Sequence, residues 1–366
     1  MQHLGSPGIK VVMASPFKLS VLDQSPIPEG YGRGDALRNT LELASAADRW
    51  GFERYWLAEH HATPGLACNS PEVMIGPVAE RTKLIRVGSG GIMLPHYSPL
   101  KVAENFGMLS SLFPGRIDLG IGRAAGTSPA VAHALQRDRR QASPDDFREQ
   151  LDELLSYFDK SFGATLPVTG RTGLPFAETP ETWLLGSSLQ SAVWSAELGL
   201  PYVFADFINP EGSDIARYYR VHFQPGSFIP EPRVGVAVWA ICAETDEEAL
   251  RLSSSIRMMM TMMFRGRLIP VPTVERAEQF LKDEGFPLDL LPIGRRFVTG
   301  SPKTVRRALE EVAANYQAQE ILVVNIVHDH QARLRSYELL AKAFDLAPRG
   351  EAAHLERAPV FSSLHS

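Results

Sequence analysis

Two adjacent histidines, His60 and His61, follow the short apolar run Trp56-Leu57-Ala58 in the first third of the chain. Imidazole changes its charge near neutral pH, so a histidine at the end of a buried strand can serve as a catalytic base or as a metal ligand. Ordinary loop polarity is the third interpretation. Neighbouring side chains of an extended backbone point to opposite faces, so we expect only one of the two histidines to face a given site.

A second histidine-rich stretch, His328-Asp329-His330, lies near the C-terminus and raises the question of a metal. His328 and His330 would share a face of an extended chain, but no carboxylate-rich or cysteine-rich partner completes a ligand set. The two cysteines, Cys68 and Cys242, are too few for a disulfide framework or a cysteine-rich metal site. We therefore predict that the protein binds no metal.

Three glycine-rich segments indicate contact with a bulky ligand. GIGRAAG (120–126) places Arg123 among glycines, where it can make a two-pronged contact with phosphate or simply be a solvated arginine in a turn. In LLGSSLQSAVW (184–194), Ser187 or Ser188 can cap a helix, and the same helix N-terminus can bind a phosphate. VGSGGIMLP (87–95) either forms a β-bulge or lets a planar ring lie against the main chain.

The elements that must position these residues alternate along the chain as βα units. The predicted strands are 18–23, 54–58, 85–91, 117–122, 182–186, 202–206, 234–242 and 320–325. The predicted helices are 34–50, 71–82, 99–113, 143–160, 189–199, 246–264, 301–316 and about 331–345. SPDD and SPKT, at 143–146 and 301–304, are typical helix starts with Ser as N-cap and Pro in the first turn.

Most of these strands are too apolar to alternate, which favours a closed (β/α)8 TIM barrel over an open doubly wound sheet. No GxGxxG follows the first strand, which also argues against the open sheet. The long segments 206–234 and 264–300 are predicted to be insertions at the C-terminal rim. We expect a single domain over 18–346, with residues 1–17 as an N-terminal extension and 347–366 as a tail.

In such a barrel the chemistry belongs at the carboxyl ends of the strands, where the histidines, glycines and serines described above all fall. The methionine-rich stretch RMMMTMMF (257–264) can line an apolar substrate pocket, although packing of a buried helix is the more ordinary interpretation. A chain of 366 residues with 22% charged residues and a net charge of −5 carries no electrostatic footprint for nucleic acid or anionic membranes. No run of about 18 apolar residues occurs, so we expect a cytoplasmic enzyme.

Several motifs together resemble the bacterial luciferase-like, flavin-dependent monooxygenase family. They are GFERYWLAEHH (51–61), VGSGGIMLPHYSPLKVAENFGMLSSLFPGRIDLGIGRAAG (87–126) and WLLGSSLQSAVWSAELGLP (183–201). The similarity extends from about residue 18 to the C-terminal helix. Within the family the chain looks like the single-chain, alkanal monooxygenase-like members.

The resemblance implies a (β/α)8 barrel that binds FMN at its C-terminal rim and works as a homodimer. Matched motif by motif, Arg123, Ser188 and Ser191 would hold the FMN phosphate, with Ser187 nearby. Gly90-Gly91 matches the non-prolyl cis peptide beside the isoalloxazine ring. His60 matches the histidine that oxygenation requires.

One position departs from the light-emitting relatives. Gly122 stands beside the flavin where their α subunit carries a reactive cysteine, so the luciferase substrate and light emission transfer less well to this chain.

The preferred function is therefore a monooxygenase that receives reduced FMN from a separate flavin reductase and uses O2 on a small organic substrate. Three rivals remain open: hydride transfer with the deazaflavin F420 on the same fold, a flavin-holding protein without turnover, and a metal-dependent barrel hydrolase.

Overall fold

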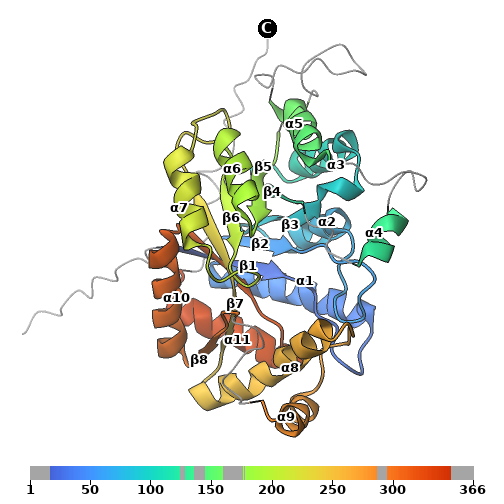
Figure 1. The fold of residues 1–366 in the computed structure, drawn as a ribbon, viewed down its shortest axis with the longest axis vertical. Helices are drawn as coiled ribbons and strands as arrows, with labels where there is room; N and C mark the ends of the chain where they lie inside the picture. Colours follow the sequence, from blue (N-terminus) through green and yellow to red (C-terminus); the bar gives the residue numbers. More distant parts are fainter. Residues whose placement is uncertain are drawn as a thin grey trace, which may run out of the picture.

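Eight parallel strands close into a ring at the centre of the protein, as the sequence predicts (Figure 1). The computed structural model describes residues 17–123, 128–135, 145–159, 176, 178–286 and 295–347. The ring is made of β1 (Lys18–Asp23), β2 (Arg54–Leu57), β3 (Arg86–Met93), β4 (Ile117–Gly122), β5 (Glu181–Gly186), β6 (Tyr202–Ala205), β7 (Val234–Cys242) and β9 (Glu320–Val324). Pairing of β9 with both β1 and β7, and of β6 with β7, closes it. The expected extension and tail lie outside the described residues, apart from their inner ends.

A ninth strand, β8 (Val298–Gly300), lies outside the ring and was not expected from the sequence. It pairs only with the last three residues of β7, where Ala240 is level with Val298. β7 therefore extends past the ring, and β8 pairs with the part of β7 that lies beyond it.

Helices cover the outside of the ring. They are α1 (Arg33–Trp50), α2 (Pro71–Arg81), α3 (Pro99–Leu112), α5 (Phe147–Phe158), α6 (Leu189–Glu197), α7 (Ser213–His222), α10 (Pro302–Tyr316) and α11 (His330–Ala343). α2, α3 and α10 each begin with a serine N-cap and a proline in the first turn, so the prediction for 301–316 is confirmed. The predicted start at 143 falls outside the described residues.

The segment 206–234 is not an insertion over the active face, which corrects the sequence-based prediction. It contains α7, which packs against α6 and α10 as a regular outer helix of the barrel. Its length reflects the loops on both sides of a ten-residue helix rather than an added module.

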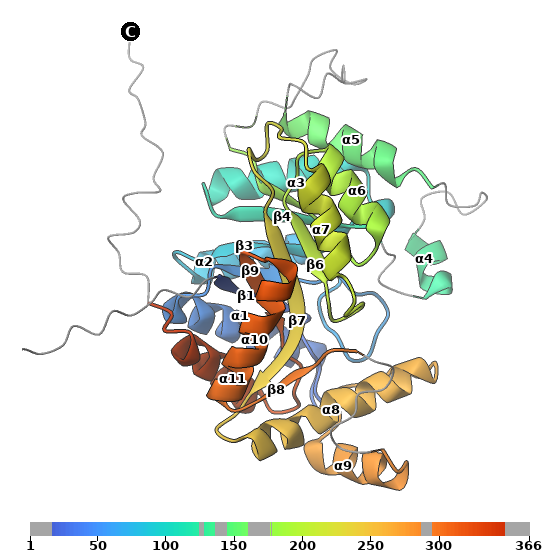
Figure 2. The ribbon, with the colours of Figure 1, turned by 60° about the vertical axis from the view of Figure 1, so that its left-hand side comes forward.

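The segment that follows β7 does add structure beyond the ring. α8 (Asp246–Phe264) and α9 (Val274–Asp283) pack against each other at one end of the molecule, as both views show (Figures 1 and 2). Met258 and Met262 of α8 pack with Ala277 of α9, and Met260 joins the barrel's interior cluster. The ordinary interpretation of the methionine-rich stretch, packing of a buried helix, therefore accounts for these three side chains.

Two separate apolar clusters form the core. On β7 the alternate residues Val236 and Val238 pack outward against the helices, whereas Ala237 and Trp239 point into the barrel. Burial on both faces explains why this strand shows no polar alternation in its sequence. Two shorter helical pieces also belong to the described structure: η1 (Leu94–His96) and α4 (Pro129–Leu135).

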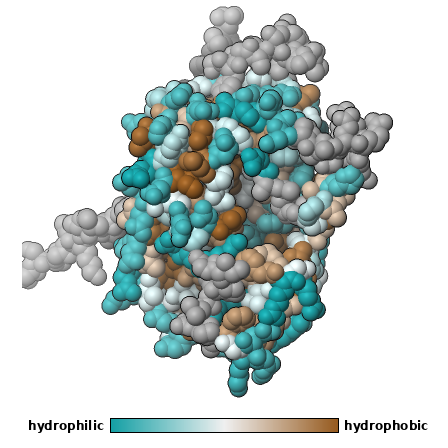
Figure 3. Space-filling view, viewed as in Figure 1, coloured by the Kyte–Doolittle hydropathy of each residue, from teal (hydrophilic) through white to brown (hydrophobic). Residues whose placement is uncertain are grey.

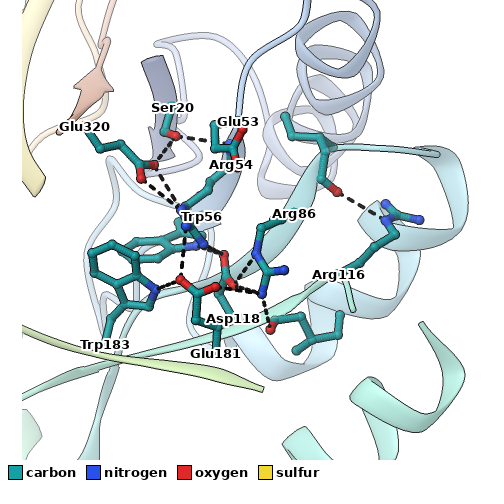
Figure 4. Close-up of polar contacts among 12 residues, drawn as sticks. Ser20, Glu53, Arg54, Trp56, Arg86, Arg116, Asp118, Glu181, Trp183 and Glu320 are labelled. Carbon is teal, nitrogen blue, oxygen red and sulfur yellow. Dashed lines mark hydrogen bonds and ion pairs between the residues drawn. The ribbon is translucent and has the colours of Figure 1, made fainter. Parts of the chain in front are cut away.

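Charged side chains close the amino-terminal end of the barrel (Figure 4). Arg54 is 2% exposed and donates to Asp118 at 2.8 Å and to Glu320 at 3.0 Å, and its third nitrogen lies 3.1 Å from Glu181. Arg86 donates to the other oxygen of Asp118 at 2.8 Å. Each of these residues stands at the first or second position of its strand. Together they fill the amino-terminal end of the barrel interior, which is called the floor below.

Neighbouring groups complete this floor network. The indole nitrogens of Trp56 and Trp183 donate to Asp118 and Glu181, both at 2.9 Å, and Arg233 pairs with Glu181 at the same distance. Ser20 donates to Glu320. Because the floor is filled and internally paired, a ligand can enter only from the opposite, carboxyl-terminal mouth.

Candidate active site

Glycines occupy the inward positions at the mouth on β3 and β4. A Cβ on Gly90 would lie 2.4 Å from Leu22 Cδ1, and one on Gly120 would lie 2.2 Å from the carbonyl oxygen of Ser89. Neither position accepts a side chain, so the sheet can pack closely there. The face of the molecule is hollowed between α6 and α7 on one side and α8 on the other (Figure 3).

The VGSGG segment contains both features that the sequence left open. The peptide bond between Gly90 and Gly91 is cis, as the resemblance implies. The register of β3 against β4 also shifts between Gly90 and Ile92, which is a β-bulge. Gly91 itself approaches β4 so closely that a Cβ would lie 2.8 Å from the carbonyl oxygen of Gly120.

Arg123 lies at the end of β4, next to the N-terminus of α6. Ile121 is level with Leu184, so continuing the register places Arg123 beside Gly186, one residue before the serine pair. The guanidinium carbon lies 5.6 Å from the ring centre of Trp194 in α6. Arg123 is exposed, which leaves its donors open to solvent or to an anion.

The serines that begin α6 differ in their availability. Ser188 is the N-cap, but its side chain makes no capping hydrogen bond, and Ser187 is half-buried beside it. Ser191 is buried: its hydroxyl donates to the Ser188 carbonyl at 2.7 Å and lies 2.9 Å from Tyr202 Oη. The register thus places Arg123 beside the strand end that leads into Ser187 and Ser188, whereas Ser191 is engaged with protein partners.

Two further glycines allow this close approach. A Cβ on Gly186 would lie 2.2 Å from Ser191 Oγ, so α6 can begin directly against β5 only because this residue is glycine. A Cβ on Gly122 would lie 3.1 Å from Met93 Sδ, a contact that a flexible methionine can relieve.

His60 follows β2 by three residues and is half-buried. The last strand residues alternate, with Trp56 in the interior cluster and Leu57 in the outer one.

The backbone of His60 is fixed by the following loop. Its N–H donates to the carbonyl of Cys68 at 3.0 Å, and its carbonyl accepts from Asn69 Nδ2 at 2.6 Å. Burial raises the pKa of the Cys68 thiol to about 12, so this cysteine is a neutral packing residue at working pH.

Glu59 and His61 share the other side of the strand. Glu59 is fully buried, with one oxygen 2.6 Å from His61 Nε2 and the other accepting from the N–H of Met93 at 2.9 Å. Burial, followed by the negative charge of Glu59, raises the pKa of Tyr97. Burial also raises the pKa of Glu72, and Glu59 adds to that rise. This pair links the end of β2 to the end of β3 and so holds the loop that carries His60.

The C-terminal histidines serve local contacts. His328 Nε2 lies 3.0 Å from the carbonyl oxygen of Glu29, and His330 Nε2 lies 3.2 Å from Glu42 Oε2. Within the part of the chain that the structure describes, no group of three or more His, Cys, Asp or Glu side chains is placed to hold a metal ion.

A search of the described helices for a membrane span found none long and apolar enough.

Sequence reasoning missed several groups near the mouth. Trp239 points inward from β7, and Arg295 lies over its ring with the guanidinium carbon 5.9 Å from the centroid. No short motif surrounds either residue, and they meet only through the fold. Glu59 was better signalled, because a carboxylate two residues from His61 on a strand must share its face.

The fold and the gathering of polar groups at one mouth define a TIM-barrel-like α/β protein. The chain belongs to the luciferase-like monooxygenase family, whose model matches residues 13–318. It is 37% identical over 327 residues to the luciferase-like monooxygenase of Escherichia coli K12, covering 87% of this chain and 95% of that protein. It is 35% identical over 337 residues to the N-acetyl-S-alkylcysteine monooxygenase of Bacillus subtilis 168, covering 91% and 100%.

Solved structures agree on the fold. The crystal structure of apo-MsnO8 is 43% identical, with a TM-score of 0.83 over 91% of this chain and 99% of that one. At lower identity, the fold alone is shared with the oxygenating constituent of 3,6-diketocamphane monooxygenase in complex with FMN (22%, TM-score 0.64, 92% and 99% covered). It is also shared with an F420-dependent secondary alcohol dehydrogenase (15%, TM-score 0.56, 91% and 99% covered).

Proposed function

We propose that the protein is an FMN-dependent monooxygenase that uses reduced FMN and O2 to oxygenate a small organic substrate. The observation that carries this proposal is the donor set at the mouth: the exposed Arg123 stands beside an α6 N-terminus whose capping serine has a free side chain. A guanidinium, two hydroxyls and the N–H groups of a helix N-terminus suit a phosphate monoester.

The residues present fit FMN. Arg123, Ser187 and Ser188 would hold the phosphate, and the ring would lie against the side-chain-free backbone of Gly90 and Gly91 at the barrel mouth. Ser191 would support the start of α6 through its bond to Ser188 rather than donate to the phosphate, unless it releases that carbonyl. Reduced flavin, when bound, supplies the electrons with which O2 is activated.

His60 is the proposed acid–base group. Its backbone is held by hydrogen bonds to the 68–69 loop, which fixes the position of the residue just after β2, and we expect its imidazole to face the mouth. There it would accept or return a proton at the reacting oxygen, a task for which an imidazole suits neutral pH.

Binding of FMN and of riboflavin, which lacks the phosphate, tests the anion site. We expect Arg123→Ala to weaken FMN binding by about ten- to a hundred-fold, the usual strength of a charge-assisted contact, and to leave riboflavin binding unchanged. Arg217→Ala, an exposed α7 arginine paired with Asp214, is the matched control. Equal loss for both ligands would refute the phosphate assignment.

F420 is the second candidate cofactor, favoured by the shared fold of the F420-dependent dehydrogenase. The absorbance spectrum of the chromophore that copurifies with the protein distinguishes the two. An FMN spectrum together with O2-dependent turnover supports the monooxygenase, whereas a deazaflavin spectrum transfers the proposal to hydride transfer.

A separate flavin reductase is the proposed functional partner. We expect turnover with chemically reduced FMN, or with NADH plus a reductase, but none with NADH alone. The first substrate panel should contain aldehydes, ketones and thioethers, including the N-acetyl-S-alkylcysteines that the relative's name specifies. Flavin binding without turnover on any member would favour the non-catalytic alternative.

We further propose a homodimer. Three large apolar side chains are exposed on the adjacent helices α2 and α3: Val73, Met108 and Leu112. Exposed apolar side chains on neighbouring helices can contribute to an association surface.

A further inference from the structure

The side chain of Trp239, on β7, points into the barrel near its carboxyl-terminal mouth. Ala237 is level with Ala205, the last residue of β6, so Trp239 lies two residues beyond the end of that strand. Its ring lies 5.5 Å from that of Phe207 and 5.8 Å from that of Phe297. The side chain is 4% exposed, and among the described residues its buried indole Nε1 has no hydrogen-bond acceptor. A buried N–H without such an acceptor is a candidate donor to a bound ligand.

Arg295 supplies a positive charge beside the Trp239 ring. Its guanidinium carbon lies 5.9 Å from the ring centre of Trp239 and 5.3 Å from that of Phe264, and Nη1 donates to the carbonyl of Phe207 at 3.0 Å. No carboxylate of the described residues lies within ion-pair distance of it. Burial lowers the pKa of Arg295 below its usual value, as expected for a cation that lacks a compensating anion.

The neighbouring Arg296 has a carboxylate partner within the protein. Arg296 forms an ion pair with Asp206 at 3.1 Å and donates to the carbonyl of Pro210 at 3.0 Å. The other carboxylate oxygen of Asp206 accepts a hydrogen bond from the Tyr316 hydroxyl at 2.8 Å. Arg296 is therefore held by Asp206 and by the carbonyl of Pro210, whereas Arg295 has no carboxylate partner among the described residues and lies beside the indole of Trp239.

We propose that Arg295 and Trp239 Nε1 bind the carboxylate of an organic-acid substrate whose hydrocarbon part lies against Phe207 and Phe297. One carboxylate oxygen accepts from the guanidinium and the other from the indole, while the aromatic rings exclude water from the chain. This inference rests on the proposed function and specifies its substrate class. It assigns Arg295 a role distinct from that of Arg123, which belongs to β4 and α6.

Binding of hexanoate and hexanamide to the FMN-loaded protein tests the inference, since the two probes match in shape and differ in charge. Tryptophan fluorescence or calorimetry gives both dissociation constants without requiring turnover. We expect hexanoate to bind at least about ten-fold more tightly than hexanamide, the effect of one charge-assisted contact. Arg295→Met should abolish that preference by weakening hexanoate binding alone.

Two further variants keep the test decisive. Arg296→Met removes an adjacent arginine that has its own partners, and we expect it to retain the preference for hexanoate. Trp239→Phe keeps the ring and removes only the N–H, so it should weaken hexanoate binding several-fold and leave hexanamide unchanged. Equal binding of both probes to the parent protein, or an unchanged preference in folded Arg295→Met or Trp239→Phe, would overturn the inference.

The outcome separates this inference from the proposed function. A protein that binds FMN but shows no preference for hexanoate keeps the flavin proposal and loses the carboxylate site. A protein that fails to bind FMN but prefers hexanoate in an Arg295-dependent manner loses the monooxygenase proposal and keeps the carboxylate site.

Discussion

At the residue scale, Asp118 is the shared anion of the charged network at the amino-terminal end of the barrel. It is fully buried, and its two oxygens accept from Arg54, Arg86 and the indole of Trp56. A buried charge with this many donors stabilises the protein only as part of the complete set, because removing one partner leaves opposite charges buried and unpaired.

Replacing Asp118 should therefore be costly. We expect Asp118→Ala to lower the free energy of unfolding by about 3–5 kcal/mol, because two buried guanidinium groups lose their shared anion. Urea denaturation followed by circular dichroism measures the change. Glu311→Ala, at an exposed α10 residue 4.0 Å from Arg307, is the control and should leave stability unchanged within error. A small effect of Asp118→Ala would mean that water reaches the barrel floor.

The same network predicts how stability depends on pH. Burial raises the pKa of Asp118, but the guanidinium groups of Arg54 and Arg86 lower it more, so it stays below the usual 3.8. A depressed native pKa gives stability that is fully present above about pH 4 and is lost as the pH falls through the native value. Asp118→Asn should flatten this decline in acid unfolding curves, and a curve parallel to the parent's would contradict it.

His60 is the residue whose replacement should affect chemistry rather than folding. We expect His60→Ala to reduce kcat by about a hundred-fold, the usual size of an acid–base contribution, with FMN affinity unchanged. Oxygen consumption and product formation, measured with reduced FMN, provide the check. His222→Ala, at an exposed α7 histidine, is the control. An unaltered kcat in His60→Ala would remove this residue from the mechanism.

At the element scale, the close approach of β3 and β4 makes glycine obligatory at Gly120. A Cβ there would lie 2.2 Å from the Ser89 carbonyl and 2.9 Å from Leu185 Cδ1, and the backbone of β3 cannot move without opening the sheet. We expect Gly120→Ala to destabilise the protein by about 3 kcal/mol or more. In Gly226→Ala the nearest atoms lie 3.6 Å away, so that variant should unfold like the parent. Thermal and urea unfolding of the two variants, compared with the parent, decides the matter.

The elements also show what the sequence could reveal. The eight ring strands and their main helices follow from apolar runs and serine–proline starts, which are local signals. α9 was missed although Val274, Ala277 and Leu281 have helical spacing after a Thr273 cap that accepts from Arg276 N–H. The signal was present, but the segment 264–300 was interpreted only as an insertion at the C-terminal rim.

Other features had no local signal. β8 has three residues and exists because β7 extends past the ring. At the site, the β4–β5 register brings Arg123 level with Gly186, just before Ser187 and Ser188, and the binding roles of these residues stay predictions. The partners of Trp239 come from the segments after β6 and before β8, and no pattern in the sequence joins those segments.

At the scale of the whole molecule, the neighbouring helices α2 and α3 expose three large apolar side chains. Val73 is 67% exposed, Met108 64% and Leu112 68%, and the two helices pack side by side. An apolar surface shared by two neighbouring helices can bury itself against a second copy related by a twofold axis, since the same face then serves both subunits.

This surface leads to the prediction that the protein is a dimer joined through α2 and α3. Light scattering after size exclusion should give twice the chain mass of 40.4 kDa. Leu112→Glu places two like charges in a desolvated interface and should shift the protein to the monomer, with unchanged circular dichroism. Val221→Glu changes an equally apolar residue that is 72% exposed on α7, and it should leave the mass at two chains. A monomeric parent would refute the dimer. A dimer that tolerates Leu112→Glu and dissociates with Val221→Glu would place the interface elsewhere than α2 and α3, because a new carboxylate is costly only where it is buried.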